Sequence, residues 1–563
     1  MKHRESFVEL DARERARAVL DEGTFREILG PFDRMESPHL EPQGIVPQSD
    51  DGVVVARGKI GGVFAVVISI EGKFQGGGIG EVAGAKIAGA LELALKDNEN
   101  GVSTRPVLLF DTGGVRLQEA NYGLLSIAEI QAAIVALRRH VPVVGVIPGK
   151  IGSFGGMSIT AGLLSALIMT REGRLGLNGP EVIEQEAGIE EFDSADRQLI
   201  WNTIGGAQRV ATGFADELAA DDVTAIAEAI RAVFARGVRE TPRSAQVELY
   251  RSLLKAVDPA QPLHTEIFRE IWQQRQGAGK KASGKAAEPD RGNAPPSRGR
   301  TWFQMLTVGC EPIAGDVPSV RCADATLGGE RVRYIAVVPD PDSRFPRARQ
   351  GEVGLEEGWA IAEYIRQAME ADQAGERRAI AAIVDVPSQA YGYREELLGI
   401  HLACAAAVDA YATARELGHP VITLVVGHAI SGAFLSHGMQ ANRILALDDE
   451  GVHVHVMSKQ SAARITRRSV AELEEATKKV PAMAYDIRSF ATLGALHELI
   501  GGVNADTPGD EDRALVQDKI AEAIKSTRFA PRDLHVRLSS EAASRGGRTA
   551  SIQVRRMLAE QWR

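Results

Sequence analysis

Two glycine-rich turns in this 563-residue sequence carry residue types that could perform chemistry with backbone groups alone. One lies in "HVPVVGVIPGKIGSFGGMSITAG" and includes Gly155 and Gly156, and the other lies in "HPVITLVVGHAISGAFLSHG" and includes Ser431-Gly432-Ala433. Each turn follows a β-branched run and precedes small residues suited to a helix start. The first N–H groups of a helix lack internal partners and attract negative charge. Such a turn can bind a phosphate or stabilise an oxyanion during acyl chemistry.

Other interpretations of these turns have to be weighed. The segment "GGGIGEVAG" at residues 76–84 has phosphate-loop glycines, but no acidic strand end follows at the ribose distance and no Gly-x-x-x-x-Gly-Lys-Ser/Thr motif exists. Ser153 and Ser431 lie near the turns, yet neither stands in a Gly-x-Ser-x-Gly elbow. The glycines could also serve close packing alone, an alternative that stays open. The oxyanion interpretation needs only backbone N–H groups.

The two turns belong to a longer internal repeat. "GEVAGAKIAGALELAL" at Gly80 parallels "GEVGLEEGWAIAEYIRQAM" at Gly351, which starts 271 residues later. "RPVLLFDTGGVRLQEANYG", with Gly113 and Gly114, then parallels "RAIAAIVDVPSQAYGYREE", and the two glycine-rich turns follow. Three blocks in the same order at nearly constant offset predict a duplicated α/β domain.

The elements that must position these turns are short apolar strands that alternate with helical segments. This order predicts an α/β fold with parallel or mixed sheets covered by helices. The segment "QGAGKKASGKAAEPDRGNAPPSRGR" is rich in Gly, Ala, Ser, Pro and charge and has no apolar period, which predicts a flexible linker. We therefore expect a domain at 1–275, a linker at 276–300 and a domain at 301–563.

The bulk composition excludes several classes of partner. The net charge of −10 argues against nucleic acid or an anionic membrane as the main partner. The first residues are charged throughout, and no run of about 20 apolar residues exists, so a cytoplasmic protein is expected. The 3 cysteines contain no Cys-x-x-Cys pair, so neither a disulfide framework nor structural zinc is expected.

The motifs around the turns resemble the carboxyltransferase branch of the crotonase-like superfamily. In the first half these are "DTGGVRLQEANYG", "GSFGGMS" and "LGLNGPEVIEQE". In the second half they are "VDVPSQAYGYREELLG", "SGAFLSHG" and "VMSKQSAARITRR". The resemblance covers roughly residues 50–240 and 320–500. It implies two crotonase-like domains, of the ClpP/crotonase type, built from repeated β-β-α units.

Departures from the carboxyltransferase motifs restrict which members of that branch the sequence resembles. The zinc-binding cysteine pairs and the Ala-Met-Lys-Met biotin segment are missing. Val386-Pro387-Ser388 replaces the usual Val-Pro-Gly, and Ser431-Gly432-Ala433 replaces Gly-Gly-Ala. Within the branch, the sequence is similar to the biotin-independent malonate decarboxylases, with their beta subunit matching the first half and their gamma subunit the second.

This similarity implies a reaction and its participants. The reaction would be decarboxylation of malonyl-S-acyl-carrier-protein to acetyl-S-acyl-carrier-protein and CO2. The substrate would arrive on the phosphopantetheine-type arm of the carrier, with no cofactor or metal bound directly and no biotin. Partners would be the acyl carrier protein subunit and an acyl-carrier transferase subunit, in an oligomeric complex.

The resemblance also assigns site residues. The N–H groups around Gly113, Gly114, Gly155 and Gly156 would hold the enolate oxygen. Ser431-Gly432-Ala433 would hold the departing carboxylate. Further substrate contacts would come from Arg116, Ser153, Ser388, Gln389 and Arg464.

The enolate then needs a proton, and several side chains near the turns could supply it. The candidates are Glu119, Tyr122, Tyr391, His428 and His437, with water as another source. Tyr122 and His428 are preferred, the latter because it directly follows a strand end. Each candidate also has a structural interpretation, such as an ion pair from Glu119 to Arg116, a packed tyrosine ring, or a histidine that only makes hydrogen bonds.

Two remaining motifs allow both a functional and a structural interpretation. His453 and His455 in "VHVHVM" have the spacing of a metal pair, but strand alternation gives the same spacing and no third ligand is evident. Arg464, Arg467 and Arg468 could form a solvated helix face or a dock for the acidic carrier protein or its arm.

Three rival functions remain. A biotin-dependent acyl-CoA carboxyltransferase would share the fold, the turns and the thioester, and would differ in requiring biotin. A non-catalytic scaffold subunit would have no need of exposed N–H pairs. A crotonase-type hydratase needs two carboxylates, whereas only the first turn offers one, Glu119.

Overall fold

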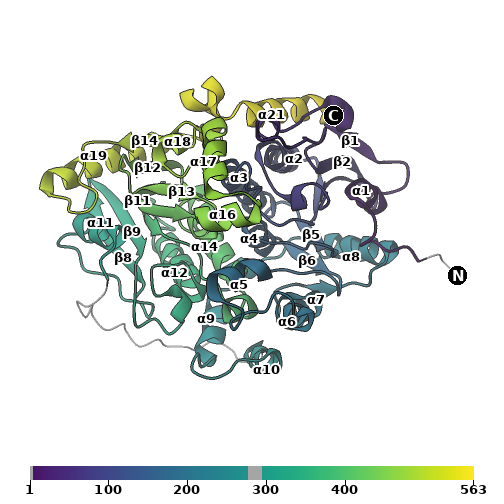
Figure 1. Cartoon of the computed structure of the whole chain (residues 1–563), viewed down its shortest axis with the longest axis horizontal. Coiled ribbons are helices and arrows are strands. Elements are labelled where there is room, and N and C mark those ends of the chain that lie inside the picture. The colour runs from purple at the N-terminus through teal and green to yellow at the C-terminus, as the bar shows by residue number, and fades with distance from the viewer. Residues whose placement is uncertain (1–3, 277–294) are drawn as a thin grey trace.

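The computed structural model describes residues 4–276 and 295–563. These residues build two seven-stranded sheets that lie side by side (Figure 1). The first sheet has the order β1 to β7, with β1 Arg26–Ile28, β2 Val53–Ile60, β3 Val63–Ile70, β4 Arg105–Leu109, β5 Val144–Ile147, β6 Ala166–Met169 and β7 Glu217–Leu218. β1, β2 and β3 are antiparallel, and the strands from β3 onward are parallel.

The second sheet repeats this plan. Its order is β14-β12-β11-β10-β9-β8, and β13 pairs with β11. Only β8 and β9 are antiparallel. The strands are β8 Val320–Leu327, β9 Glu330–Val337, β10 Ala379–Val386, β11 Val421–Ile430, β12 Arg443–Leu447, β13 His453–His455 and β14 Leu496–Ile500.

Each half begins with a tight hairpin that the sequence dictates. Gly61 and Gly62 join β2 to β3 with φ of 59° and 76°, and Gly328 and Gly329 join β8 to β9 with φ of 57° and 87°. A two-residue hairpin turn with positive φ at both positions matches the twist of the strands, and glycine adopts it without strain. Each hairpin then leads into a helix and a parallel strand, so the predicted α/β fold of repeated β-β-α units is confirmed.

Helices connect the parallel strands in the same order in both halves. In the first half they are α2 Glu81–Glu99, α3 Asn121–Leu137 and α4 Gly156–Gly162; in the second they are α12 Leu355–Ala371, α14 Ile400–Glu416 and α15 Ser431–Ser436. Gly80 precedes α2 with φ −107° and ψ −157°, and Gly354 precedes α12 with φ −109° and ψ −160°. Gly354, and not Gly351, is therefore the counterpart of Gly80.

The remaining helices extend the two halves. They are α1 Ala12–Val19, α5 Pro180–Ala187, α6 Arg197–Ile204, α7 Gly206–Ala211, α8 Val223–Arg236, α9 Val247–Ala256, α10 Thr265–Gln276, α11 Arg298–Leu306, α13 Tyr393–Leu397, α16 Lys459–Ile465, α17 Val470–Lys479, α18 Ile487–Ala491, α19 Asp510–Thr527, α20 Val536–Ser539 and α21 Thr549–Gln561. Within the part of the chain that the structure describes, none is long and apolar enough to cross a membrane.

The two halves share one hydrophobic core. α3 and α4 of the first half pack against α14 and α15 of the second. A Cβ at Gly162 of α4 would lie only 2.7 Å from the Cβ of Ala405 on α14, so small residues allow the helices to approach. The amide of Gln440 also donates to the carbonyl of Ala128 across this boundary, at 3.0 Å.

Each half also packs one of its later helices on the other. α9 packs on α12, where the rings of Tyr250 and Trp359 stack at 4.9 Å between centroids. In return α21, at the end of the chain, lies on α2 (Figure 1). Arg555 of α21 pairs there with Glu92 at 2.9 Å and with Glu129 at 2.8 Å. Each half therefore places one helix against the other half.

The predicted linker lies largely outside the described residues, which omit 277–294. At its edges, α10 ends at Gln276 and α11 already begins at Arg298, so the helix starts inside the range predicted as linker. The division into domains 1–275 and 301–563 stays a prediction, now with a shared core between them.

Candidate functional site

The two predicted turns of the first half adjoin each other at the carboxyl ends of β4 and β5. The N–H of Phe154 donates to the carbonyl of Thr112 at 3.1 Å. Gly114 has a φ of +104°, and a Cβ there would lie 3.1 Å from the Cα of Gly155. Both the left-handed backbone and the close approach require glycine at position 114. The carboxyl ends of parallel strands are where α/β sheets place their ligand sites.

Most of the predicted N–H donors are already used inside these turns. Gly113 donates to the carbonyl of Gly76 at 2.9 Å, Gly114 to the hydroxyl of Thr112 at 3.0 Å, and Gly155 to the carbonyl of Leu177 at 2.9 Å. Of the four predicted donors, only Gly156 has an N–H without a partner among the described residues. This corrects the expectation for the other three.

A further donor was missed by the sequence interpretation. The N–H of Val115 also has no partner in the described part of the chain, and a Cβ on Gly155 would lie 3.9 Å from this nitrogen. Val115 and Gly156 therefore present two free N–H groups from adjoining turns. We call Val115 and Gly156 the first donor pair.

The second half repeats this backbone. The residues on either side of Val115 both bond to Ile79: Ile79 N–H donates to Gly114 O at 2.8 Å, and Arg116 N–H donates to Ile79 O at 2.9 Å. The residues on either side of Gln389 bond to Val353 in the same way: Val353 N–H donates to Ser388 O at 3.1 Å, and Ala390 N–H donates to Val353 O at 3.0 Å. Gly155 and Ser431 share a left-handed φ, +56° and +54°. The counterparts of Val115 and Gly156 are thus Gln389 and Gly432, the second donor pair.

One donor of the second pair, the N–H of Gly432, is occupied by the protein itself. The N–H of Gly432 donates to Oε1 of Gln389 at 3.2 Å. Nε2 of Gln389 in turn donates to Oδ1 of Asn178, a residue of the first half, at 2.9 Å. Gln389 is buried, with 5% of its surface exposed. The predicted anion-binding turn at Ser431-Gly432-Ala433 therefore holds an internal amide oxygen.

A buried carboxylate, Glu396, holds Asn178, the residue that binds the Gln389 amide. Glu396 accepts the N–H groups of Leu177 and Asn178 at 3.0 and 2.7 Å, and the side-chain amide of Asn178 at 3.0 Å. Its nearest cation is Arg209 at 3.7 Å. Burial raises the pKa of Glu396 to about 7, although Arg209 opposes the shift.

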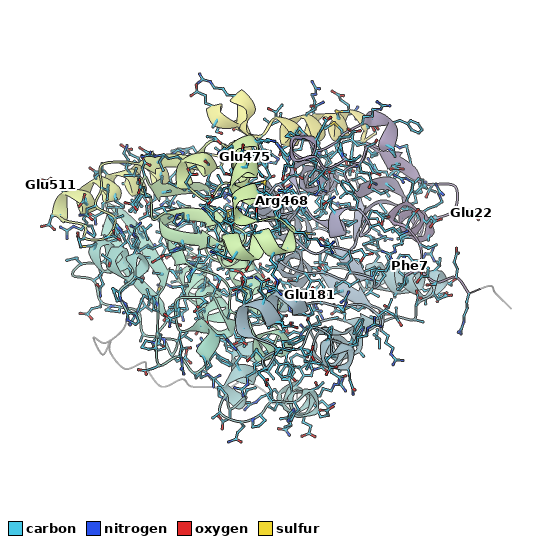
Figure 2. The ribbon with its side chains drawn as sticks, viewed as in Figure 1. Phe7, Glu22, Glu181, Arg468, Glu475 and Glu511 are labelled. Atoms are coloured by element: carbon cyan, nitrogen blue, oxygen red, sulfur yellow. The ribbon has the colours of Figure 1, made fainter. Side chains whose placement is uncertain are left out.

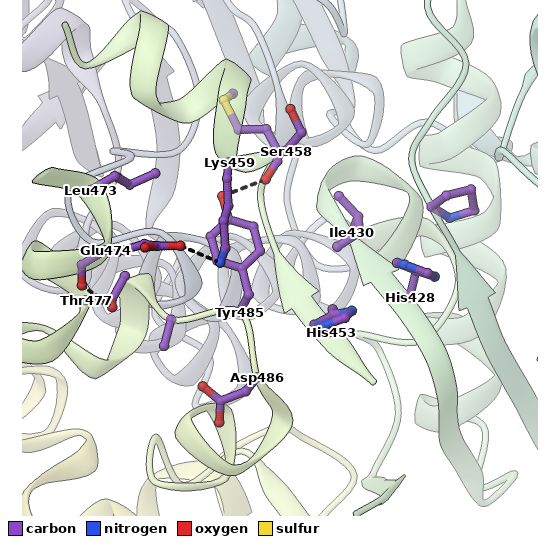
Figure 3. Close-up of a pocket in the computed structure, with 13 residues that line it drawn as sticks. His428, Ile430, His453, Ser458, Lys459, Leu473, Glu474, Thr477, Tyr485 and Asp486 are labelled. Atoms are coloured by element: carbon purple, nitrogen blue, oxygen red, sulfur yellow. Dashed lines mark hydrogen bonds and ion pairs between the residues drawn. The ribbon is translucent and has the colours of Figure 1, made fainter. Parts of the chain in front are cut away.

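A separate cavity of about 590 Å³ lies at the carboxyl ends of β10 and β11 (Figure 3). His428 and His453 face it with ring centroids 5.6 Å apart, and Lys459 pairs with Glu474 at its far side at 3.0 Å. Its lining residues all come from the second half. His428 thus borders this cavity and not the first donor pair.

Comparisons with known proteins match the two halves of the chain to different families. A family described as "Carboxyl transferase domain" matches residues 9–252, and a family described as "Malonate decarboxylase gamma subunit" matches residues 348–562. The malonyl-S-ACP:biotin-protein carboxyltransferase MADC of Malonomonas rubra is 42% identical over 280 residues, 47% of this chain and 88% of the relative. The chain belongs to the malonate decarboxylase family.

Other members of the malonate decarboxylase family match one half each. The M. rubra protein MADD, also named a malonyl-S-ACP:biotin-protein carboxyltransferase, is 36% identical over 228 residues, 39% of this chain and 76% of the relative. A chain of a Pseudomonas malonate decarboxylase hetero-tetramer, solved with malonate, is 59% identical. That match covers 48% of this chain and 97% of the other, with a TM-score of 0.47.

Arg116, predicted to bind substrate, has a structural role in this family member. Its guanidinium is buried and pairs with Asp51 at 2.6 Å and with Glu119 at 2.7 Å. Glu119 is itself fully buried, so its interpretation as an ion-pair partner of Arg116 is confirmed. Neither side chain is placed to meet a substrate.

The other predicted substrate contacts differ in their environments. Ser153 is buried, and its hydroxyl has no partner among the described residues. Ser388 is half-buried in the second-half turn, and Gln389 fills the second donor pair. Arg464 is exposed on α16.

The predicted proton donors fall into distinct environments. Tyr122, in the first turn of α3, stacks on His39 at 4.6 Å, and burial raises its pKa well above the usual range. Burial also raises the pKa of Tyr391, whose hydroxyl lies 3.5 Å from Nε2 of Gln389. His437 is fully buried between Tyr411 and a backbone carbonyl, and burial lowers its pKa to about 4.

His428 is the most exposed of these donors, with 51% of its side chain accessible. Its Nδ1 lies 3.5 Å from Asp385, which also accepts the His428 N–H at 3.0 Å. Burial would raise the pKa of Asp385, but the hydrogen bonds from His428 and Gly299 hold it below its ordinary range.

The two histidines of "VHVHVM" do not act together. His455 is buried, with its ring nitrogens 3.1 Å from the carbonyls of Met457 and Met483, and it stacks on Tyr485. His453 borders the cavity instead. No group of three His, Cys, Asp or Glu side chains in the described residues could hold a metal ion.

The arginine cluster lies where the second half crosses the first. Arg464 and Arg467 are exposed, whereas Arg468 reaches Oε1 of Gln43 in the first half at 2.9 Å. Figure 2 labels Arg468 near the centre of the face it shows. Part of this cluster is therefore a contact between the halves.

Proposed function

We propose that the chain is the decarboxylating unit of a malonate decarboxylase complex, acting on a malonyl thioester carried by an acyl carrier protein. The first donor pair supports this most directly, because two N–H groups without a partner among the described residues lie on adjoining turns. Membership of the malonate decarboxylase family supports the substrate class.

Breaking the bond between the methylene and carboxyl carbons releases CO2 and leaves its electron pair in an enolate. The negative charge then resides largely on the thioester oxygen. The N–H groups of Val115 and Gly156 would hold that oxygen. A preorganised donor of this kind typically lowers the activation free energy by about 3–4 kcal/mol.

The leaving carboxylate has the opposite requirement. Its charge disappears as CO2 forms, so donors that hold it would stabilise the ground state more than the transition state. The occupied second donor pair is compatible with this demand, since Gly432 already donates to Gln389. We therefore assign the second turn no role in binding the carboxylate.

The enolate carbon finally takes up a proton. Tyr122 is preferred to His428 because it neighbours Gly123 in the chain, where a Cβ would lie 2.6 Å from Cγ1 of Val115, whereas His428 borders the second-half cavity. A raised pKa keeps the Tyr122 phenol protonated and able to donate.

Delivery of the substrate is part of the same proposal. The carrier's phosphopantetheine-type arm would bring the malonyl group, and the exposed Arg464 and Arg467 would attract the acidic carrier. The carrier and a transferase that loads it would be further subunits. No biotin would take part.

A second function remains in competition. The relatives MADC and MADD are named for carboxyl transfer from malonyl-S-ACP to a biotin protein. In that case the carboxyl group would move to an acceptor and would not leave as CO2.

The deciding experiment mixes the purified chain with malonyl-CoA or a malonyl-carrier thioester without biotin, and measures CO2 and acetyl thioester. Release of both is expected. Products that form only after a biotinyl acceptor is added would favour the carboxyltransferase instead. If no product forms with or without the biotinyl acceptor, the chain needs the other subunits of its complex.

A further inference from the structure

We infer that Gln389 determines the fate of the carboxyl carbon: by occupying the Gly432 N–H of the second donor pair, its side chain prevents a carboxyl acceptor from binding there, so CO2 leaves. This inference rests on the proposed decarboxylation at the first donor pair. Gln389 is a specificity-determining residue in this account, because it is not required to touch the enolate.

The internal repeat supplies the reason to single out this side chain. Val115 and Gln389 are bracketed by the same two backbone hydrogen bonds, and Gly156 and Gly432 follow residues with the same left-handed φ. The backbone of the two donor pairs is therefore equivalent. The side chain at the first position of each pair differs, apolar in Val115 and an amide in Gln389.

The amide oxygen lies where a ligand oxygen would otherwise be. Oε1 of Gln389 is 3.2 Å from the nitrogen of Gly432. A Cβ on Gly432 would meet this same oxygen at 3.3 Å and Cδ1 of Leu177 at 3.4 Å. An outside oxygen could reach the N–H of Gly432 only by displacing Gln389.

A chain of hydrogen bonds fixes which end of the amide faces Gly432. Both oxygens of Glu396 accept backbone N–H groups, so the Asn178 side chain must present its NH2 to them. Asn178 then offers its oxygen to Nε2 of Gln389, at 2.9 Å. Gln389 is left with its oxygen toward Gly432, as the donor there requires.

This closure needs both halves of the chain. Glu396 and Gln389 belong to the second half, whereas Asn178 belongs to the first, and Asn178 also donates to the carbonyl of Ala390 at 3.0 Å. All of these side chains are buried. The closed state is therefore built into the core between the two sheets and does not depend on a surface loop.

Chemistry explains what an open second pair could do. A cyclic urea accepts CO2 at nitrogen: the N–H proton passes to the enolate carbon, the nitrogen forms a bond to the carbon of CO2, and negative charge develops on the urea oxygen meanwhile. Free N–H donors would stabilise that oxygen. The products would be acetyl thioester and a carboxylated urea, with every atom accounted for.

The test replaces Gln389 with its counterpart from the first half. Gln389→Val frees the Gly432 N–H, whereas Gln389→Glu, protonated on the oxygen that faces Oδ1 of Asn178, keeps an acceptor oxygen on Gly432 and serves as the matched control. Equilibrium dialysis with labelled biotin, a cyclic urea, measures access. We expect biotin to bind Gln389→Val at least about tenfold tighter than the wild type or Gln389→Glu, since one ordinary hydrogen bond has that value.

A second readout follows the carboxyl carbon from labelled malonyl thioester. Wild type should release all of it as CO2, and Gln389→Val should divide it between CO2 and biotin. Equal biotin binding by wild type and Gln389→Val, with both folded, would overturn the inference. If Gln389→Val does not fold, Asn178→Ala removes the anchor of the amide and should give the same gain in binding; no gain there would also overturn it.

The two proposals fail in different ways. Wild-type chain that transfers carboxyl to biotin and releases no CO2 would contradict the proposed function and this inference together. Wild type that releases CO2, beside a folded Gln389→Val that neither binds nor carboxylates biotin, would contradict this inference alone.

Discussion

The second donor pair is the counterpart, in the internal repeat, of the first donor pair. Both are built from a turn after one parallel strand and a turn after the next, with matching hydrogen bonds and matching left-handed residues. The first leaves the N–H groups of Val115 and Gly156 free, whereas the second holds the amide of Gln389. One side chain can therefore close a site whose backbone is retained.

The largest expected difference in kcat is between two alanine variants, one in each donor pair. In Gly156→Ala the new Cβ would lie 2.6 Å from Cδ1 of Leu435 and 3.0 Å from Cγ2 of Ile127, so either the backbone of the turn or these packed side chains must shift. In Gly432→Ala the nearest atom is 3.3 Å away. We expect kcat for decarboxylation to fall about 100-fold or more in Gly156→Ala, the cost of losing one oxyanion donor, and only a few-fold in Gly432→Ala.

Circular dichroism and thermal unfolding would confirm that both alanine variants fold. Equal losses of kcat in the two variants would remove the distinction between the first and second donor pairs.

The next effect separates the two preferred proton donors. Tyr122→Phe should lower kcat by about 10- to 100-fold, since it removes the proposed general acid. His428→Ala should leave kcat within about threefold, because His428 borders the second-half cavity. Steady-state kinetics of both variants against the wild type provide the measurement. A larger loss in His428→Ala would move the chemistry to the second half.

A third, smaller effect concerns the shape of the first turn. Thr112 accepts the N–H of Gly114 at 3.0 Å, and its counterpart in the second half is Val386. Thr112→Val keeps the volume but loses this acceptor, which frees Gly114 and loosens the turn. We expect kcat to fall about tenfold, the value of one hydrogen bond. The reverse change, Val386→Thr, is the control and should have little effect on kcat.

The smallest effect is on stability and follows from Glu396, the anchor of the closed pair. Burial raises its pKa from 4.5 to about 7, so the folded state retains a proton that the unfolded chain has lost. This contribution to stability is fully present below pH 4.5 and is lost as pH rises through about 7. The free energy of unfolding of wild type relative to Glu396→Gln should therefore decrease across that window.

Urea unfolding of the wild type and Glu396→Gln at several pH values would measure this difference, with a slope of at most about 1.4 kcal/mol per pH unit. A difference that does not change with pH would show that Glu396 titrates normally.

Much of the fold follows from the sequence, whereas the details of the site do not. Glycine pairs at hairpins, apolar strands and repeated blocks are local signals, and they predict the duplicated α/β architecture. The repeat was aligned three residues out of register at Gly351, because the shared letters "GEV" outweigh the backbone position that Gly354 occupies. With an offset of 274 residues, Val115 and Gln389 align directly.

The roles of individual residues depend on partners that are distant in sequence. Gly113 and Gly155 look like free donors until their acceptors, Gly76 and Leu177, are known. Arg116 looks like a substrate ligand until Asp51 meets it in the core. The closure by Gln389 requires Asn178, about 200 residues away along the chain, so no local pattern could reveal it.

The infrared carbonyl stretch of an isotopically labelled acetyl thioester bound to the chain reports which donor pair holds the thioester oxygen. Donors that polarise the thioester oxygen lower this frequency. We predict a lowered frequency in the wild type and in Gln389→Val, and its loss in Gly156→Ala. A shift that persists in Gly156→Ala and disappears in Gly432→Ala would contradict the account, because the second donor pair would then hold the thioester.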